Sequence, residues 1–290
     1  MDDQKKQQKI YESINDFFFR IFELKDSGKM EQFFRFLKKV PNHAPFNNTL
    51  VFIQNPDCKY YATANQWEKR FRRTIKKDAR PMVVLFPFGP VEFVYDIDNT
   101  EGEPINDENI LFWWRENGGT LDEEIIENTE RNLEVLGVQY TQLGAREYFE
   151  NNNLSTGGYA QRTYSNNELS IALHPQYSEK TIGAYGVLCH EIAHILLGHL
   201  GQVVLPKKKE NQSEKVIAKD RSSTPKHIKE LEAELTAWIV FNSIGIEKNS
   251  ESYLACWLRE QSDFSTLSMS DVLRVAGKIQ EMGKNRNIFR

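Results

Sequence analysis

The chain has 290 residues, enough for one large domain or two ordinary ones, and its 40% hydrophobic and 27% charged residues are typical of a soluble globular protein. A net charge of −4 argues against a protein that simply coats nucleic acid. No apolar run approaches the roughly 18 to 20 residues of a membrane span, the first residues lack a secretory signal, and the three scattered cysteines form no disulfide framework, so we expect a cytoplasmic protein with no membrane partner.

Four helices are expected in the first part of the chain, at residues 8–24, 30–40, 46–54 and 63–71. Thr63 is a suitable N-cap for the fourth of them. Two strands are expected at residues 81–88 and 91–97, and residues 97–108, rich in acidic residues with Gly and Pro, predict a loop or a domain boundary. We therefore expect a small helical and β N-terminal domain at residues 1–105, followed by a linker at 106–118.

A basic segment precedes the first of these strands. Residues 67–80, WEKRFRRTIKKDAR, hold seven basic and two acidic residues. Basic groups that follow a phosphate backbone, with rings on which bases stack, form a surface for single-stranded nucleic acid. The candidate residues are Trp67, Lys69, Arg70, Arg72, Arg73, Lys76, Lys77 and Arg80. The alternative, which these residues by themselves favour, is a solvated basic face with Trp67 and Phe71 buried in the core.

The second part of the chain alternates helices with strands. We expect a helix at residues 121–137, a strand at 138–143 and a hairpin at 158–174. A further helix follows, with Ser178 as its N-cap, and residues 201–226 are polar and lysine-rich, which predicts a loop. A helix at 226–243 and two C-terminal helices complete an α+β domain at residues 119–290.

The stretch CHEIAHILLGH, residues 189–199, contains three of the six histidines of the chain. His190 and His194 are one helical turn apart, so they share a face of the predicted helix. In a His-Glu-x-x-His helix, two imidazoles reach one zinc ion and the glutamate lies beside the water that the zinc activates. The alternative is a pair of histidines on a packed helix.

A catalytic zinc needs a third protein ligand. The stretch KELEAELTAWIV offers Glu230 and Glu234, which again share a helical face. We assign Glu230 to the metal and Glu234 to the free N–H of a ligand histidine, with the reverse assignment left open. Glu232 points away from Glu230 and is expected in solvent, and His199 is interpreted as a polar residue near a helix C-terminus.

This set of residues predicts amide hydrolysis by a zinc peptidase. Zinc lowers the pKa of a bound water and polarises a carbonyl group. Glu191 takes the proton as the water attacks and passes it to the leaving amine. The strand LSIAL, if it is the edge of a sheet, is expected to hold an extended peptide by strand addition.

The stretch LCHEIAHILLGH, followed by ELEAELTAWIVFNSIGI and YLACWL, resembles the zincin-like metallopeptidase half of the ArdC-type plasmid antirestriction proteins. It is also similar, more distantly, to small zincins that cleave phage-type repressors. Upstream, FNNTLVFIQNP, ANQWEKRF and IKKDARPMVVLFP follow the order of the first family's N-terminal single-stranded-DNA-binding domain. The resemblance implies His190 and His194 as zinc ligands, Glu191 as the catalytic base and a third ligand among the acids of ELEAE. It also turns the interpretation of residues 67–80 towards DNA binding.

The sequence therefore predicts an α+β protein of two domains. The first binds single-stranded DNA, and the second is a zincin-like HExxH metallopeptidase that acts on a protein or peptide substrate in antirestriction-type protection of mobile DNA. One rival hypothesis is a non-catalytic protein that binds and shields DNA, with a structural zinc. A further rival is a regulatory peptidase that cleaves a repressor.

Overall fold

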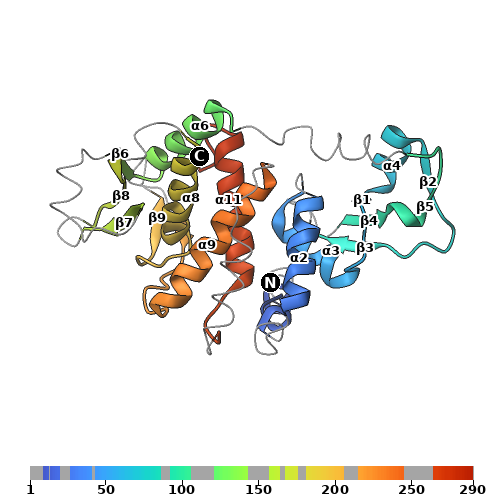
Figure 1. Ribbon diagram of the computed structural model, residues 1–290, viewed down its shortest axis with the longest axis horizontal. Helices are drawn as coiled ribbons and strands as arrows, with labels where there is room; N and C mark the ends of the chain where they lie inside the picture. Colours follow the sequence, from blue (N-terminus) through green and yellow to red (C-terminus); the bar gives the residue numbers. More distant parts are fainter. Residues whose placement is uncertain are drawn as a thin grey trace. The chain divides into compact units, whose positions relative to one another are not determined.

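The computed structural model describes residues 9–12, 14–19, 27–40, 43–85, 92–105, 121–142, 157–163, 167–175, 181–205, 215–244 and 264–289. The chain divides into two compact units, the first formed by residues 1–119 with 242–264 and the second by residues 120–241 with 265–290. Both units mix helices with strands (Figure 1), so the chain has the predicted α+β composition. The linker predicted at 106–118 lies outside the described residues.

The helices of the first unit pack through aromatic side chains. Residues 9–12 and 14–19 are helical, and they are followed by α2 (Ser27–Lys39), α3 (Pro45–Gln54) and α4 (Ala64–Phe71). The rings of Phe18 and Phe52 each meet Phe33 edge to face, with centroids 4.9 and 5.2 Å apart. Thr63 caps α4 as predicted, in a reciprocal pair of hydrogen bonds with Gln66.

The strands of the first unit form two small antiparallel sheets. One has the order β1-β4-β3, from β1 (Tyr61–Ala62), β4 (Glu92–Asp96) and β3 (Met82–Val84). The other pairs β2 (Arg73–Ile75) with β5 (Thr100–Gly102), which follows a 3-10 turn at Ile97–Asn99. Residues 97–108 were predicted as a loop, and that prediction is wrong for 100–102. The Arg73 guanidinium explains the difference, because it donates to the Thr100 hydroxyl and to the carbonyls of Thr100 and Glu103.

The second unit contains a sheet of order β6-β8-β7 and helices packed against it (Figure 1). Its elements are α6 (Glu123–Val135), β6 (Val138–Gln142), β7 (Gly158–Arg162), β8 (Leu169–Leu173), α8 (Ile182–Leu196), β9 (Val203–Leu205), β10 (Lys215–Ala218), α9 (Lys226–Ser243) and α11 (Met269–Lys284). Strand β6 runs parallel to β8, and β7 pairs with β8 as the predicted antiparallel hairpin. Helix α8 packs on β7 and β8, and α11 packs on α6 and α8.

Two local predictions in the second unit are wrong. Helix α8 begins at Ile182, and its N-cap is Thr181, not Ser178. Residues 201–226 were predicted as a loop, but β9 and β10 pair there as an antiparallel ribbon. The buried side chains of Val203 and Ala218 anchor the two strands, and this long-range burial outweighs the lysine-rich composition of the segment. Among the described residues, no helix combines the length and apolar character needed to cross a membrane.

Candidate metal centre

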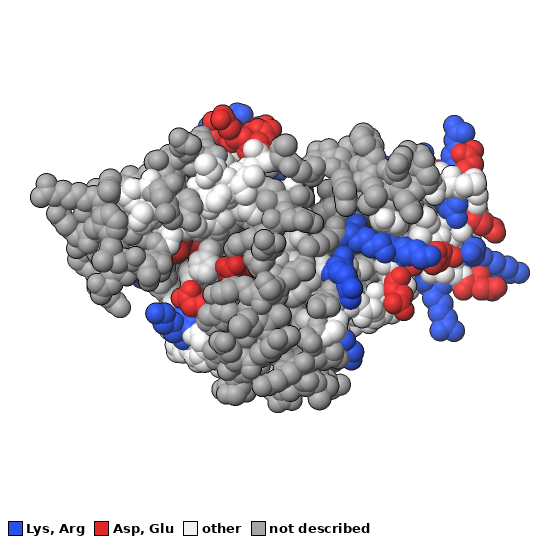
Figure 2. All heavy atoms as spheres, in the orientation of Figure 1, with Lys and Arg blue, Asp and Glu red and all other residues white. Residues whose placement is uncertain are grey.

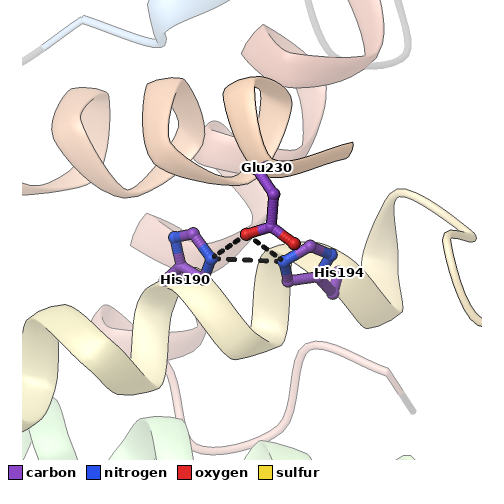
Figure 3. A group of neighbouring side chains, drawn as sticks. All are labelled: His190, His194 and Glu230. Atoms are coloured by element: carbon purple, nitrogen blue, oxygen red, sulfur yellow. Dashed lines mark hydrogen bonds and ion pairs between the residues drawn. The ribbon is translucent and has the colours of Figure 1, made fainter. Parts of the chain in front are cut away.

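The motif histidines lie on α8, whose other side chains are largely buried in the second unit. Gly186, one turn before His190, faces α9 closely: a Cβ at this position would lie 3.1 Å from the Phe241 ring. The two helices can therefore bring short polar side chains together. Figure 3 shows the imidazoles of His190 and His194 directed from α8 towards Glu230 on α9.

Three ligand atoms meet between the two helices. The Nε2 atoms of His190 and His194 are 3.2 Å apart, and Oε2 of Glu230 lies 3.5 Å from the first and 3.7 Å from the second. Zinc–ligand bonds of roughly 2.0 to 2.1 Å at tetrahedral angles place neighbouring ligand atoms about 3.3 Å apart. The three distances are thus close to those of one tetrahedral face, and the donor set of two imidazoles and a carboxylate suits zinc.

Glu234 lies on the other side of His190. Its Oε2 is 3.3 Å from Nδ1 of His190, the ring nitrogen that faces away from the three-atom cluster. A metal-binding histidine commonly donates its second N–H to a carboxylate in this way. Glu230 therefore lies beside both Nε2 atoms, whereas Glu234 contacts the outward ring nitrogen of His190.

His199 lies near the C-terminus of α8 as predicted, but Glu232 is placed differently from the prediction. Neither side chain reaches solvent, although Glu232 was expected to be solvated. Nδ1 of His199 is 3.0 Å from Nδ1 of His194, and its Nε2 is 2.8 Å from Glu232. The prediction for Glu232 failed because α9 is buried on nearly all sides: from Leu231 to Asn242 only Glu234 is partly exposed. A signal was present in the sequence, since ELTAWIVF leaves this helix without a polar face.

The electrostatics of the cluster favour a cation. Burial opposes a charge on His190, but hydrogen bonds with Glu230 and Glu234 raise its pKa to about 9. The pKa of Glu230 falls well below its usual range, chiefly because the imidazoles of His190 and His194 lie beside its carboxylate. Glu230 is also the most accessible of the three, with 39% of its side chain exposed, so the cluster opens to solvent on that side.

Glu191 projects from another part of α8 and contacts strand β7. It is buried, and burial raises the pKa of its carboxyl group, while the amide of Ala160 donates a hydrogen bond to it. In the β7–β8 pair the Thr163 amide bonds to the Glu168 carbonyl, so the alternation of an antiparallel ladder turns the amide of Ala160 outward from the sheet. Glu191 therefore lies at the outer edge of β7.

Strand β8, which contains LSIAL, is the central strand of its sheet and is paired on both sides. It is not available for strand addition, so the expectation that it holds a peptide is wrong. The hydrophobic pattern of β8 reflects burial in the centre of a sheet. Among the described strands, β7 has no partner on its outer side, and it is this strand that borders Glu191.

The basic segment of the first unit has a mixed environment. Trp67 is fully buried and its indole N–H donates to the carbonyl of Tyr95, which is the core position described by the alternative interpretation. Arg73 is committed to the β2–β5 pair, and the ammonium group of Lys76 donates to the carbonyl of Asp98. Arg72 is exposed and lies 3.4 Å from Glu103.

The remaining basic candidates, Lys69, Arg70, Lys77 and Arg80, are exposed to solvent. Figure 2 shows Lys and Arg side chains interspersed with Asp and Glu over the part of the molecule that carries α4, β2 and β5. A nucleic-acid contact here would depend on these four side chains and Arg72, without a stacking ring from Trp67.

No protein-family model matches the chain, and neither does any curated protein. Among solved structures, the chain is similar to the Mn(II)-bound antirestriction ArdC protein from plasmid R388. The two share 13% sequence identity with a TM-score of 0.39, and the match covers 90% of this chain and 98% of that one. A likeness this weak carries no functional argument.

Proposed function

We propose that this chain is a zinc-dependent peptidase whose first unit binds single-stranded DNA. The observation that carries the peptidase proposal is the meeting of His190, His194 and Glu230 at the distances of a tetrahedral face, with Glu191 buried on the same helix. Two histidines and a carboxylate are the protein ligands of several catalytic zinc sites, which keep one position open.

The ligand residues fit a divalent ion because both histidines turn Nε2 towards the cluster and their Nδ1 atoms towards other partners. When bound, the ion supplies a Lewis acid that polarises a substrate carbonyl and acidifies water. The raised pKa of His190 and the lowered pKa of Glu230 favour a positive charge on the imidazole beside a negative charge on the carboxylate. A bound cation would take the place of that positive charge.

Glu191 supplies the proton transfers. Burial raises the pKa of its carboxyl group, which brings the base closer to a neutral working pH. The hydrogen bond from the Ala160 amide holds the carboxylate in place. Glu191 accepts the proton of the attacking water and then delivers it to the nitrogen of the leaving amine.

We further propose that an extended peptide adds to the outer edge of β7. The backbone groups of Gly158, Ala160 and Arg162 are directed to that edge, and among them only the Ala160 amide is taken by Glu191. Strand addition would place a scissile carbonyl beside the ligand cluster while the peptide backbone bonds to the edge. Strand β7 thus takes the role that the sequence suggested for β8.

Glu191→Gln tests the peptidase proposal. The parent is expected to hydrolyse a mixture of quenched-fluorescent peptides, to lose this activity with a chelator and to recover it with zinc. Glu191→Gln should keep about one zinc per chain, measured by elemental analysis that also covers manganese, and should lose at least about a hundredfold in rate. The exposed Glu134→Gln on α6 is the matched control. Undiminished hydrolysis by Glu191→Gln would refute the assigned base.

Binding of DNA is proposed from the exposed basic residues of the first unit. Charge reversal at Lys69, Lys77 and Arg80 should weaken binding of a single-stranded oligonucleotide and reduce the dependence of affinity on salt. Arg73 and Lys76 are excluded from this test, because their side chains hold the backbone of the unit. Unchanged affinity and salt dependence in the triple variant would overturn this part of the proposal.

The resemblance of the motif segments to antirestriction proteins leads us to propose protection of incoming DNA as the process served. A plasmid-transfer assay in a restricting host separates this from its rivals. If Glu191→Gln protects as well as the parent while the basic-surface variant does not, the protein shields DNA without catalysis. If neither Glu191→Gln nor the basic-surface variant affects protection, and the second unit cleaves one repressor, the protein is a regulatory peptidase and not a protector of DNA.

A further inference from the structure

A chain of hydrogen-bonded side chains leads from the metal centre into the core of the second unit. His194 Nδ1 lies 3.0 Å from His199 Nδ1, and His199 Nε2 lies 2.8 Å from Oε2 of Glu232. We propose that His199 and Glu232 are positioning residues, which hold the proton of His194 on Nδ1 and so direct its Nε2 lone pair to the metal. This inference rests on the metal site of the proposed function.

Which atoms carry the hydrogens along this series of side chains follows from the partners of its last member, Glu232. Oε1 of Glu232 accepts hydrogen bonds from Arg221, at 2.6 Å, and from the Ser268 amide, at 2.7 Å. With a guanidinium and an amide both donating to its carboxyl group, Glu232 acts as an acceptor, so the hydrogen between Glu232 and His199 belongs to His199 Nε2. A neutral His199 then presents a lone pair at Nδ1, and the hydrogen between the two imidazoles belongs to His194 Nδ1.

The hydrogen-bonded side chains are held at their far end, because Glu232 joins three separate parts of the second unit. Ser268 is the N-cap of α11, Arg221 follows β10, and Glu232 lies on α9. His199 is tied in turn, since its carbonyl accepts from Lys229 of α9. Any rotation of the His194 ring would break the contact with His199, and no exposed side chain is needed to hold it.

The two histidine ligands are therefore held by different outer partners. His190 has the carboxylate of Glu234, which is partly exposed, whereas His194 has an imidazole backed by a fully buried carboxylate. Removing an outer partner of a metal ligand commonly weakens metal binding by about 10- to 100-fold. The loss of the His199 acceptor should fall in that range.

His199→Phe and His199→Asn separate positioning from packing. Phenylalanine fills the volume but offers no acceptor, while asparagine leaves space but places an amide oxygen near the position of Nδ1. Positioning predicts that zinc affinity of the full chain falls about 10- to 100-fold in His199→Phe and recovers substantially in His199→Asn. If His199 only fills space, zinc affinity should follow folding stability instead, and His199→Asn should bind zinc more weakly than His199→Phe. Glu232→Gln should also weaken binding, and Asn132→Ala, a buried polar change on α6, should not.

The tautomer of His194 provides a readout that needs no metal. Long-range ¹H–¹⁵N spectra of the metal-free parent should show His194 protonated at Nδ1, and His199→Phe should lose this preference while His199→Asn keeps it. Zinc affinity that is equal in His199→Phe and the parent, or a His194 protonated at Nε2 in the parent, would overturn the inference. A parent that shows the expected tautomer but binds no zinc would refute the metal site and leave the hydrogen-bonded chain established.

Discussion

Exchange of the two carboxylates on α9 for amides should have unequal effects on metal binding. Glu230→Gln removes a charged oxygen that lies within 3.7 Å of both Nε2 atoms, whereas Glu234→Gln alters a contact with the outward Nδ1 of His190. Both changes preserve side-chain length and both sites are only partly buried, so the folds of the two metal-free variants should be similarly stable.

The magnitude follows from mass action. With free zinc at about 100 times the parent Kd, binding stabilises the fold by about 2.7 kcal/mol. A tenfold weaker Glu234→Gln site would retain about 1.4 kcal/mol, and a Glu230→Gln site weakened by about 100-fold would retain about 0.4 kcal/mol. For a unit of this size, 1 kcal/mol corresponds to about 2 to 4 °C in Tm. The zinc-dependent rise in Tm should thus be about 5 to 10 °C, 3 to 5 °C and at most 2 °C in the three proteins.

Thermal unfolding at zinc concentrations set by a chelator buffer measures these shifts, and elemental analysis gives the stoichiometry. A large loss in Glu234→Gln together with parent-like binding in Glu230→Gln would reverse the two roles. Parent-like zinc shifts in both variants would show that neither carboxylate belongs to the site.

Three further predictions concern separate features of the chain. Gly198→Ala should destabilise the second unit by more than Gly137→Ala does in urea unfolding. Both glycines have φ near 75°, but a Cβ at Gly198 also collides with the backbone of Lys219. Equal losses of stability in the two variants would contradict this. Burial lowers the pKa of His43 to about 4, so the unfolded chain binds a proton at higher pH than the folded one. The free energy of unfolding of the first unit should therefore fall by about 3 kcal/mol between pH 6.5 and pH 4. His43→Phe should flatten this pH dependence in unfolding measurements. Ala160→Pro removes the amide that bonds Glu191 and blocks the edge of β7, so peptide hydrolysis should fall at least tenfold with zinc content unchanged, and parent-like hydrolysis would exclude this edge.

Features that depend on short stretches of sequence were predicted well. The spacing of His190 and His194 places them on one face of a helix, because helical periodicity is a property of the backbone alone. Glu230 and Glu234 share a face of α9 for the same reason, and Thr63 caps α4 through atoms only three residues apart. The hairpin of β7 and β8 was likewise indicated by its alternating pattern.

Features that depend on which distant segments pack against a helix or strand were not predicted from the sequence. The same helical angles that united Glu230 and Glu234 placed Glu232 on the opposite face. The apolar stretch ELTAWIVF indicated that this face is buried, but not that Arg221 and the start of α11 are the groups that cover it. Trp67 was open to two interpretations until its burial was known.

The sequence by itself thus indicated the groups of the candidate site: two imidazoles one helical turn apart, with Glu191 beside them, and two carboxylates one turn apart on a second helix. Only the tertiary structure decided which groups surround that site, namely His199 and Glu232 behind His194 and the edge of β7, not β8, beside Glu191. The physical reason is that side-chain direction along one helix follows from local backbone geometry, whereas burial and sheet order are set by segments far apart in the chain.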